Sequence, residues 1–252
     1  MLKSGLVSIT FRNKTVKEIC ALCEKAQLNA IEWGGDVHVP PKGNKAKETL
    51  ALTCDHGLTV SSYGSYFRLG EGMDAFQYNL DEALTLESPV IRIWGGKKDS
   101  KDFTEGERKY AVDELMRASE IAHGAGVQVT LEYHPFSLTD DRESVKKLLK
   151  ETEGEPFSPM FYWQPRWDWG EEESLKALCD VQSRLLHVHI FKWEHTPNAI
   201  IRKPLEEGAS LIRRAMDVKK DGYMLIEFVK DDLDEMLLKD AETLNRLIRG
   251  RE

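Results

Sequence analysis

Eight short runs of apolar, mostly β-branched residues alternate with helical stretches along the 252 residues of this chain. The predicted strands lie at residues 5–9, 30–33, 59–63, 90–94, 127–133, 160–164, 186–191 and 223–228. This alternation is typical of a parallel sheet covered by helices, and an open doubly wound sheet usually stops at about six strands. Because the length is also close to the roughly 250 residues of one barrel, we predict an α/β protein, a single (β/α)8 TIM barrel over residues 1–252.

The first predicted helix, at residues 15–27, has a clear start signal. Thr15 can cap the helix, and Glu18 follows at the spacing of a capping box. Cys20 and Cys23 have the CxxC spacing but fall on the apolar side of this amphipathic stretch. We therefore predict buried or half-buried thiols at these two positions, in preference to a redox or zinc site.

The charge and hydropathy of the chain bear on its partners. The formal net charge is −8, which repels a phosphate backbone, and no basic patch interleaved with aromatic residues compensates for it. No segment approaches the roughly 18 apolar residues of a membrane span, and no signal-peptide pattern precedes the first strand. We expect no nucleic-acid partner, no membrane partner and a cytoplasmic location, which the isolated Cys54 and Cys179 also fit.

Four strands in the second half of the chain end on a residue that can bind a divalent cation. These residues are Glu132, Gln164, His189 and Glu227, and each is about one strand–helix–strand unit, roughly 30 residues, from the next. The carboxyl ends of parallel barrel strands meet at one mouth of the barrel, where a single ion could contact all four side chains. The spacing therefore predicts one site built by four consecutive units.

The chain resembles the xylose-isomerase-like superfamily of TIM barrels, which includes sugar isomerases and epimerases, 3-dehydroshikimate dehydratases and endonuclease IV. The motifs that carry the resemblance are Ser-Ile-Thr-Phe-Arg at 8–12, Ile-Glu-Trp-Gly-Gly at 31–35, Leu-Glu-Tyr-His-Pro at 131–135, Leu-Thr-Asp at 138–140, His-Val-His at 187–189 and Ile-Glu at 226–227. The Leu-Glu-x-His-Pro and Leu-Thr-Asp motifs look most like the dehydratase and its relatives.

The resemblance implies a Mn²⁺, Mg²⁺, Co²⁺ or Zn²⁺ ion held by Glu132, Gln164, His189 and Glu227. It also implies His189, in preference to His187, as the histidine ligand. Gln164 departs from the family pattern, which has Asp at the end of the sixth strand. Because a neutral amide oxygen supplies no charge, we expect weaker metal binding than is usual in the family.

At such a site a dication polarises a carbonyl and an adjacent hydroxyl, so the proton on the α-carbon becomes acidic and the resulting enediolate is stabilised. Glu132 and Glu227 are the predicted catalytic acid and base, because carboxylates on opposite sides of the ion can remove and return a proton. This chemistry predicts an isomerase or epimerase of a small sugar or polyol. Loss of a β-hydroxyl would instead give a dehydratase of the 3-dehydroshikimate type. The third alternative is a metal-free barrel that binds a polyol without converting it.

Several further side chains are candidates for contact with the substrate. Arg12 and Arg92 can pair with a carboxylate or phosphate, although Arg92 could equally neutralise Glu132 inside the barrel. Lys192 is a second anion contact or a surface residue, and His134 either orients the substrate or caps its strand. Aromatic faces suit a sugar ring, but large aromatic residues also fit a homo-oligomer interface, which we keep as a further expectation. The aromatic candidates are Trp33, Tyr63 and Trp167, the last of which stands where relatives often carry a His.

Overall fold

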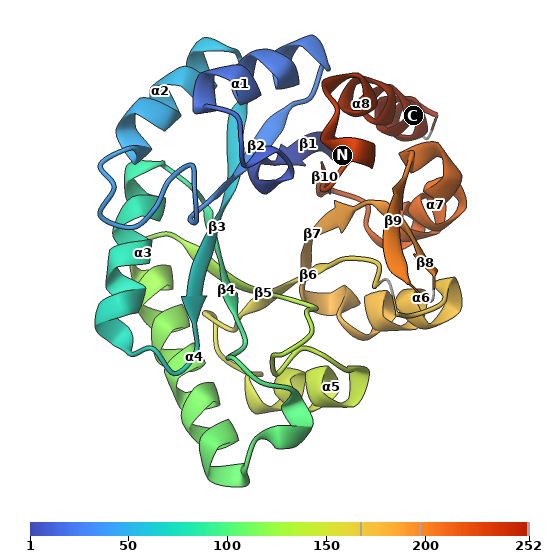
Figure 1. Ribbon diagram of the computed structural model, residues 1–252. Helices are drawn as coiled ribbons and strands as arrows, with labels where there is room; N and C mark the ends of the chain where they lie inside the picture. Colours follow the sequence, from blue (N-terminus) through green and yellow to red (C-terminus); the bar gives the residue numbers. More distant parts are fainter. Residues whose placement is uncertain (167, 197, 251–252) are drawn as a thin grey trace.

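The computed structural model describes residues 1–166, 168–196 and 198–250. Eight parallel strands close into a barrel in the order β1, β10, β7, β6, β5, β4, β3, β2 (Figure 1). The barrel strands are β1 (Leu2–Val7), β2 (Ala30–Gly34), β3 (Thr59–Arg68), β4 (Val90–Trp94), β5 (Gln128–Glu132), β6 (Met160–Trp163), β7 (Leu185–Ile190) and β10 (Gly222–Ile226). Each overlaps one predicted strand, and the predicted (β/α)8 TIM barrel is confirmed.

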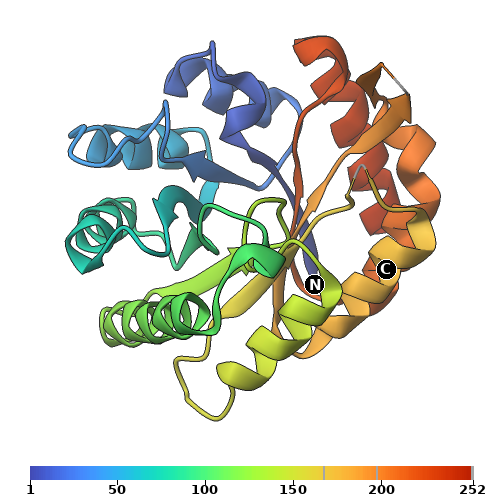
Figure 2. The same cartoon turned by 60° about the horizontal axis from the view of Figure 1, so that its bottom comes forward.

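Eight helices surround the barrel, and Figure 2 shows them arranged around the central strands. They are α1 (Val16–Lys25), α2 (Ala46–Asp55), α3 (Met73–Thr85), α4 (Glu105–Gly124), α5 (Arg142–Glu151), α6 (Glu171–Asp180), α7 (Ala209–Val218) and α8 (Asp234–Arg249). The main hydrophobic core lies between the outer faces of the strands and these helices. Alternate residues of each strand point outward to this core, which leaves the other residues to fill the barrel and line its mouth. Within the described ranges, none of these helices combines the length and the apolar character that crossing a membrane requires.

Helix α1 begins as its sequence predicts. The Thr15 side chain accepts a hydrogen bond from the backbone N–H of Glu18, and the Glu18 carboxylate accepts one from the backbone N–H of Thr15. Cys20 and Cys23 are buried in the core on the inner side of the same helix, and burial raises the pKa of both thiols. The prediction of buried thiols is confirmed.

Replacement of Thr15 by Ala removes half of this capping box. We expect the free energy of unfolding to fall by about 1 kcal/mol, because the backbone N–H of Glu18 loses its acceptor, the Thr15 hydroxyl. The Glu18 carboxylate also loses its hydrogen bond from that hydroxyl. Chemical denaturation of the two proteins, monitored by circular dichroism, measures the difference. An unchanged denaturation midpoint would mean that water caps the helix equally well.

One element was not predicted. An antiparallel hairpin of β8 (Lys192–Thr196) and β9 (Ala199–Lys203) follows β7, before α7 (Figure 1). β8 is mostly polar, and the apolar residues of β9 are three exposed positions, 199–201, too few for the run by which the barrel strands are recognised. Arg202 of β9 forms an ion pair with Asp232, which follows β10. The hairpin thereby contacts the loop after the last barrel strand, on the side of the barrel where the strands end.

Candidate active site

Three side chains from three barrel strands converge at the mouth of the barrel. Glu132 ends β5, His189 lies in β7, and Glu227 directly follows β10. One ligand atom of each lies within 4.8 Å of the others, and all three side chains are buried. Strands of similar length that run in parallel bring their carboxyl ends to the same level, which is why residues so distant in sequence meet here.

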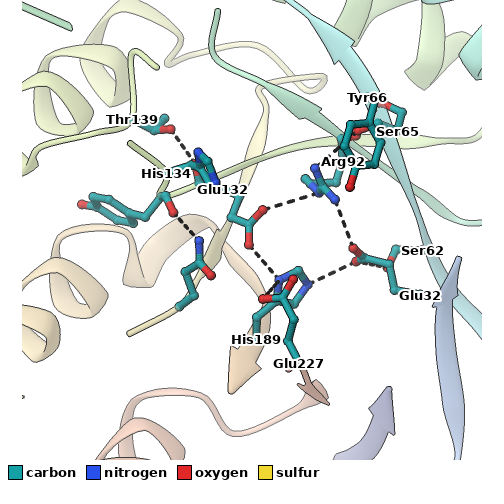
Figure 3. A network of polar contacts seen from close by, with 12 residues as sticks. Glu32, Ser62, Ser65, Tyr66, Arg92, Glu132, His134, Thr139, His189 and Glu227 are labelled. Carbon is teal, nitrogen blue, oxygen red and sulfur yellow. Dashed lines mark hydrogen bonds and ion pairs between the residues drawn. The ribbon is translucent and has the colours of Figure 1, made fainter. Parts of the chain in front are cut away.

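The imidazole of His189 lies between two carboxylates (Figure 3). Its Nδ1 is 2.8 Å from Oε1 of Glu132, and its Nε2 is 3.3 Å from Oε2 of Glu32 in β2. Burial alone would lower the pKa of His189, but Glu32 and Glu132 outweigh burial and hold that pKa well above its usual value. Without a metal, His189 is therefore an imidazolium that donates a hydrogen bond to each carboxylate.

Glu32 belongs to a buried network on the other side of His189. Ser62 donates a hydrogen bond to Oε2 of Glu32 at 2.6 Å, and Nη2 of Arg92 lies 3.6 Å from Oε1 of Glu32. Nε of Arg92 is also 3.6 Å from Oε2 of Glu132. Gly64 makes room for this pairing, because a Cβ at that position would lie 2.8 Å from Oε1 of Glu32 and 2.9 Å from Arg92. Charges inside the barrel are thus compensated in pairs, as burial requires.

The two carboxylates of the cluster differ in protonation. Burial alone would raise the pKa of Glu132, but His189 and Arg92 outweigh it, so this pKa is lowered. Burial raises the pKa of Glu227 to about 7; Glu132 and Glu32 act in the same direction, whereas His189 opposes them. Oε2 of Glu227 accepts no hydrogen bond from the described residues, although it is buried. This oxygen lies 3.7 Å from Nδ1 of His189. A buried carboxylate oxygen without a hydrogen bond, beside a second carboxylate and an imidazole, is a donor set that fits a divalent cation.

Gln164 lies at the edge of this cluster, just past β6. Its Nε2 donates a hydrogen bond to the backbone carbonyl of Tyr133 at 2.7 Å. A carbonyl oxygen can accept only from the amide nitrogen, so this contact fixes the orientation of the Gln164 amide. Its Oε1 is then free to act as a metal ligand. The structure therefore places all four predicted ligand residues at one end of the barrel.

A cleft of about 280 Å³ opens beside these side chains. Its lining combines acidic, basic and aromatic residues from seven of the eight barrel units. They include Arg12, Tyr66, Arg68, Arg92, Trp94, Glu132, His134, Gln164, Arg166, Trp193, Glu227 and Phe228. The volume is near the lower end of the range for small-molecule sites, which suits a ligand of a few carbon atoms.

Three of the predicted substrate contacts line this cleft, namely Arg12, Arg92 and His134. Arg12 is held by Asp36 and by the hydroxyl of Tyr66, both at 2.8 Å. The His134 ring stacks edge-on against Trp94, with 4.1 Å between ring centroids. These contacts fix both side chains at the rim of the cleft.

The aromatic candidates are corrected by the structure. Trp33 and Tyr63 are fully buried on the outer face of the barrel, where Trp33 donates a hydrogen bond to Thr53 of α2 and Tyr63 donates one to the carbonyl of Val39. Strand alternation is the reason, because each lies one position beyond a residue that points inward. Trp167 lies outside the described residues.

Lys192 does not line the main cleft. It borders a neighbouring cavity of about 70 Å³, which shares Arg166 and Trp193 with the cleft, so its role as an anion contact stays a prediction. His187, which lies on the same face of β7 as His189, packs between Tyr162 and Tyr223 instead of contacting the carboxylates. The structure thus brings His189, and not His187, to the candidate metal centre.

Glu32 was missed as a site residue. Its signal was present, because Glu32 interrupts the apolar run at 30–33 in the same way that Glu132 and Glu227 interrupt theirs. Tyr66 and Arg68 were also missed. The structure extends β3 to Arg68, five residues beyond the predicted end, and thereby places both residues at the cleft.

Comparisons with known proteins agree with this architecture. A 3-dehydroshikimate dehydratase of Bacillus anthracis is 26% identical over 166 residues, which cover 60% of this chain and 58% of that relative. The chain therefore spans less than two thirds of the length of this curated relative.

Three solved structures share the fold over nearly the whole chain. A probable 3-DHS dehydratase from Bacillus anthracis has a TM-score of 0.78 and 18% identity, with 97% of this chain and 99% of that chain covered. A D-allulose 3-epimerase from Methylomonas sp. has a TM-score of 0.76 and 14% identity, with 98% of each chain covered. A xylose isomerase-like TIM barrel protein from Mycobacterium smegmatis, in complex with magnesium, has a TM-score of 0.73 and 12% identity, with 99% of this chain and 98% of that chain covered.

The sequence also matches a family directly. Residues 20–247 match the family described as xylose isomerase-like TIM barrel, which is most of the chain. The matched region contains β2 to β10 and so includes Glu32, Glu132, His189 and Glu227. The chain belongs to the xylose isomerase-like TIM barrel family.

Proposed function

We propose that this protein is a divalent-metal-dependent isomerase or epimerase of a small sugar or polyol. The observation that carries the proposal is the convergence of Glu132, His189 and Glu227 within 4.8 Å at the base of an open cleft. Two structural neighbours support it, one named as an epimerase and one bound to magnesium. Gln164 completes the proposed ligand set through its amide oxygen.

When bound, a dication at this site would polarise the substrate carbonyl and so acidify the neighbouring C–H bond. Both Glu132 and Glu227 would be ionised with the ion bound, so either carboxylate could accept the proton from the substrate carbon. The two stand on different strands beside His189, so one of them could remove the proton and the other could return one.

The second candidate is a dehydratase that acts on 3-dehydroshikimate or a related compound. It is favoured by the curated relative with 26% identity. The same removal of a proton next to a carbonyl starts this reaction, and a carboxylic acid then protonates the departing β-hydroxyl. Neither reaction requires a residue that the other does not use.

The two reactions can be distinguished in deuterium oxide. We expect the Mn²⁺-loaded protein to introduce deuterium beside the carbonyl of a ketose such as D-allulose or L-ribulose and to form its epimer, both followed by NMR. Loss of water from 3-dehydroshikimate, without exchange in any sugar, would establish the dehydratase instead. Ligand binding with neither reaction would overturn both and leave a barrel that binds a polyol without converting it.

Metal binding should depend strongly on pH. Coordination requires neutral His189 and ionised Glu227, whereas in the metal-free protein the pKa of His189 is well above its usual value and burial raises the pKa of Glu227 to about 7. We therefore expect the apparent Mn²⁺ affinity to rise with pH through about 7 and to fall at least roughly tenfold per unit below it. Calorimetry in two buffers of different ionisation enthalpy measures the protons released. A pH-independent affinity would show that the ion binds elsewhere.

A further inference from the structure

Arginines outnumber acidic residues in the lining of the cleft, although the chain as a whole carries a net charge of −8. Four arginines face it: Arg12, Arg68, Arg92 and Arg166. We propose that the substrate carries one carboxylate and that Arg68 binds it. This inference rests on the proposed function and names the substrate class for that site. It concerns a residue that was not among the sequence-predicted contacts.

Two of the four arginines are already paired with aspartates of the protein. Nε of Arg12 lies 2.8 Å from Oδ2 of Asp36. Arg166 makes two parallel hydrogen bonds to Asp168, at 2.8 and 2.5 Å, and a third to a backbone carbonyl. Each guanidinium therefore has its charge balanced, and each serves mainly to shape the rim.

Arg92 is also committed. It is fully buried between Glu32 and Glu132, 3.6 Å from each, and the two pairs hold it against the inner wall of the barrel. Its charge is thus balanced by two protein carboxylates, although its Nε makes no hydrogen bond with the described residues. Arg12 and Arg92, the two arginines first expected to bind an anion, are therefore poorer candidates than Arg68.

Arg68 differs from the other three. Its guanidinium donates a hydrogen bond to the carbonyl of Gly96 at 3.3 Å and lies 4.9 Å from the Trp94 ring centroid. No carboxylate in the described part of the chain forms an ion pair with it. Nearby Glu71 is occupied elsewhere, because it accepts the backbone N–H of Arg68 and pairs with Lys97 at 2.8 Å. Arg68 thus retains unused donors and an unbalanced charge.

The charge balance limits the ligand. A dication with Glu132 and Glu227 sums to zero, and the arginines other than Arg68 are each balanced by a protein carboxylate. One positive charge remains at the cleft, which matches one carboxylate better than the roughly two negative charges of a phosphate monoester. A neutral sugar would leave this charge without a partner in a partly enclosed cleft.

The geometry of β3 and β4 gives the carboxylate its place. Alternation along β3 puts Gly64, Tyr66 and Arg68 on the cleft side, and the Trp94 ring lies beneath both Arg68 and Arg92. Since Arg92 also touches Glu132, this wall directly adjoins the candidate metal centre. A hydroxycarboxylate bound to Arg68 would point its other end toward the carboxylates that carry out the proposed proton transfer.

The test compares acids with their neutral counterparts by calorimetry on the Mn²⁺-loaded protein. The pairs are D-glucuronate and D-glucose, D-galacturonate and D-galactose, and glycolate and ethylene glycol, with D-glucose 6-phosphate as a phosphate arm. We expect at least one acid to bind about tenfold or more tightly than its neutral partner. The variant Arg68→Gln should bring that ratio close to one, whereas Arg68→Lys should keep part of it. Arg214→Gln on the surface of α7 should leave it unchanged.

Equal binding of acids and neutral partners would overturn the proposal, as would an acid preference that survives in Arg68→Gln. Tightest binding of the phosphate ester would overturn the carboxylate assignment, and so would a failure of every acid to bind. These outcomes are separate from failure of the proposed function. Mn²⁺ binding is measured first in each variant, and we expect Arg68→Gln to leave it intact, so loss of the metal would count against the metal centre and not against Arg68.

Discussion

Replacing Glu132 with Gln is expected to weaken Mn²⁺ binding by about 100-fold or more and to abolish any metal-dependent turnover. Glu132 contributes a full negative charge to the candidate ligand set, and its Oε1 lies 2.8 Å from Nδ1 of His189. The change to Gln keeps the shape of the side chain but removes the charge. Direct titration of the metal-free protein with Mn²⁺, followed by calorimetry, measures the loss.

Two variants make this prediction sharper. Gln164→Asp should tighten Mn²⁺ binding, because it restores a negative charge at the end of β6. Glu82→Gln is a matched control, since Glu82 is a buried carboxylate of α3 that accepts a hydrogen bond from the backbone of Lys42, far from the cluster. If Glu132→Gln and Glu82→Gln bind Mn²⁺ equally well, the candidate centre is not where the metal binds.

The second large effect is on stability. We expect Arg92→Met to lower the free energy of unfolding of the metal-free protein by about 3 to 5 kcal/mol. Arg92 is 2% exposed and lies against both Glu32 and Glu132, so its loss leaves these two buried carboxylates with His189 but without the guanidinium charge. Urea denaturation at pH 7 measures the change. Since Met fills a volume similar to that of Arg, the substitution creates little cavity, and a new cavity does not explain the effect.

A double-mutant cycle identifies the cause. Adding Glu32→Gln to Arg92→Met should recover part of the lost stability, since it removes one of the uncompensated charges. The exposed pair Arg214 and Glu172 gives the comparison, and we expect Arg214→Met to cost about 0 to 1 kcal/mol. An effect of Arg92→Met no larger than that of Arg214→Met would mean that water enters the barrel and screens the two glutamates.

Most of the fold could be read from the sequence because each barrel strand is a short apolar run bounded by polar turns. The β8–β9 hairpin could not, since its few apolar residues are mostly exposed and it contacts the loop after β10, which lies outside any local pattern. The end of β3 was misplaced for a related reason. Its last residues include Tyr66 and Arg68, which face the cleft and so break the apolar run.

The candidate site was predictable where a charged residue interrupts an apolar strand. It was not predictable where the role of a residue depends on the direction in which its side chain points. Glu132, His189 and Glu227 stand at strand ends, so their convergence follows from the barrel itself. Trp33 and Tyr63 also stand near strand ends, but their side chains point outward, and composition does not reveal on which face an aromatic residue lies. Which arginines are balanced depends on aspartates and glutamates from other units, so the special position of Arg68 appears only in three dimensions.

The barrel is closed by pairing its first strand with its last, since Leu2 lies opposite Gly222 and Leu6 opposite Ile226. During synthesis β1 therefore has one unpaired edge until nearly the whole chain has left the ribosome. An open edge of a mostly buried strand invites pairing with other chains, and such distant contacts form slowly. We expect nascent chains that stop before β10 to aggregate or to require a chaperone. The strand that positions Glu227 therefore also covers the open edge of β1 and so protects the folded chain from aggregation.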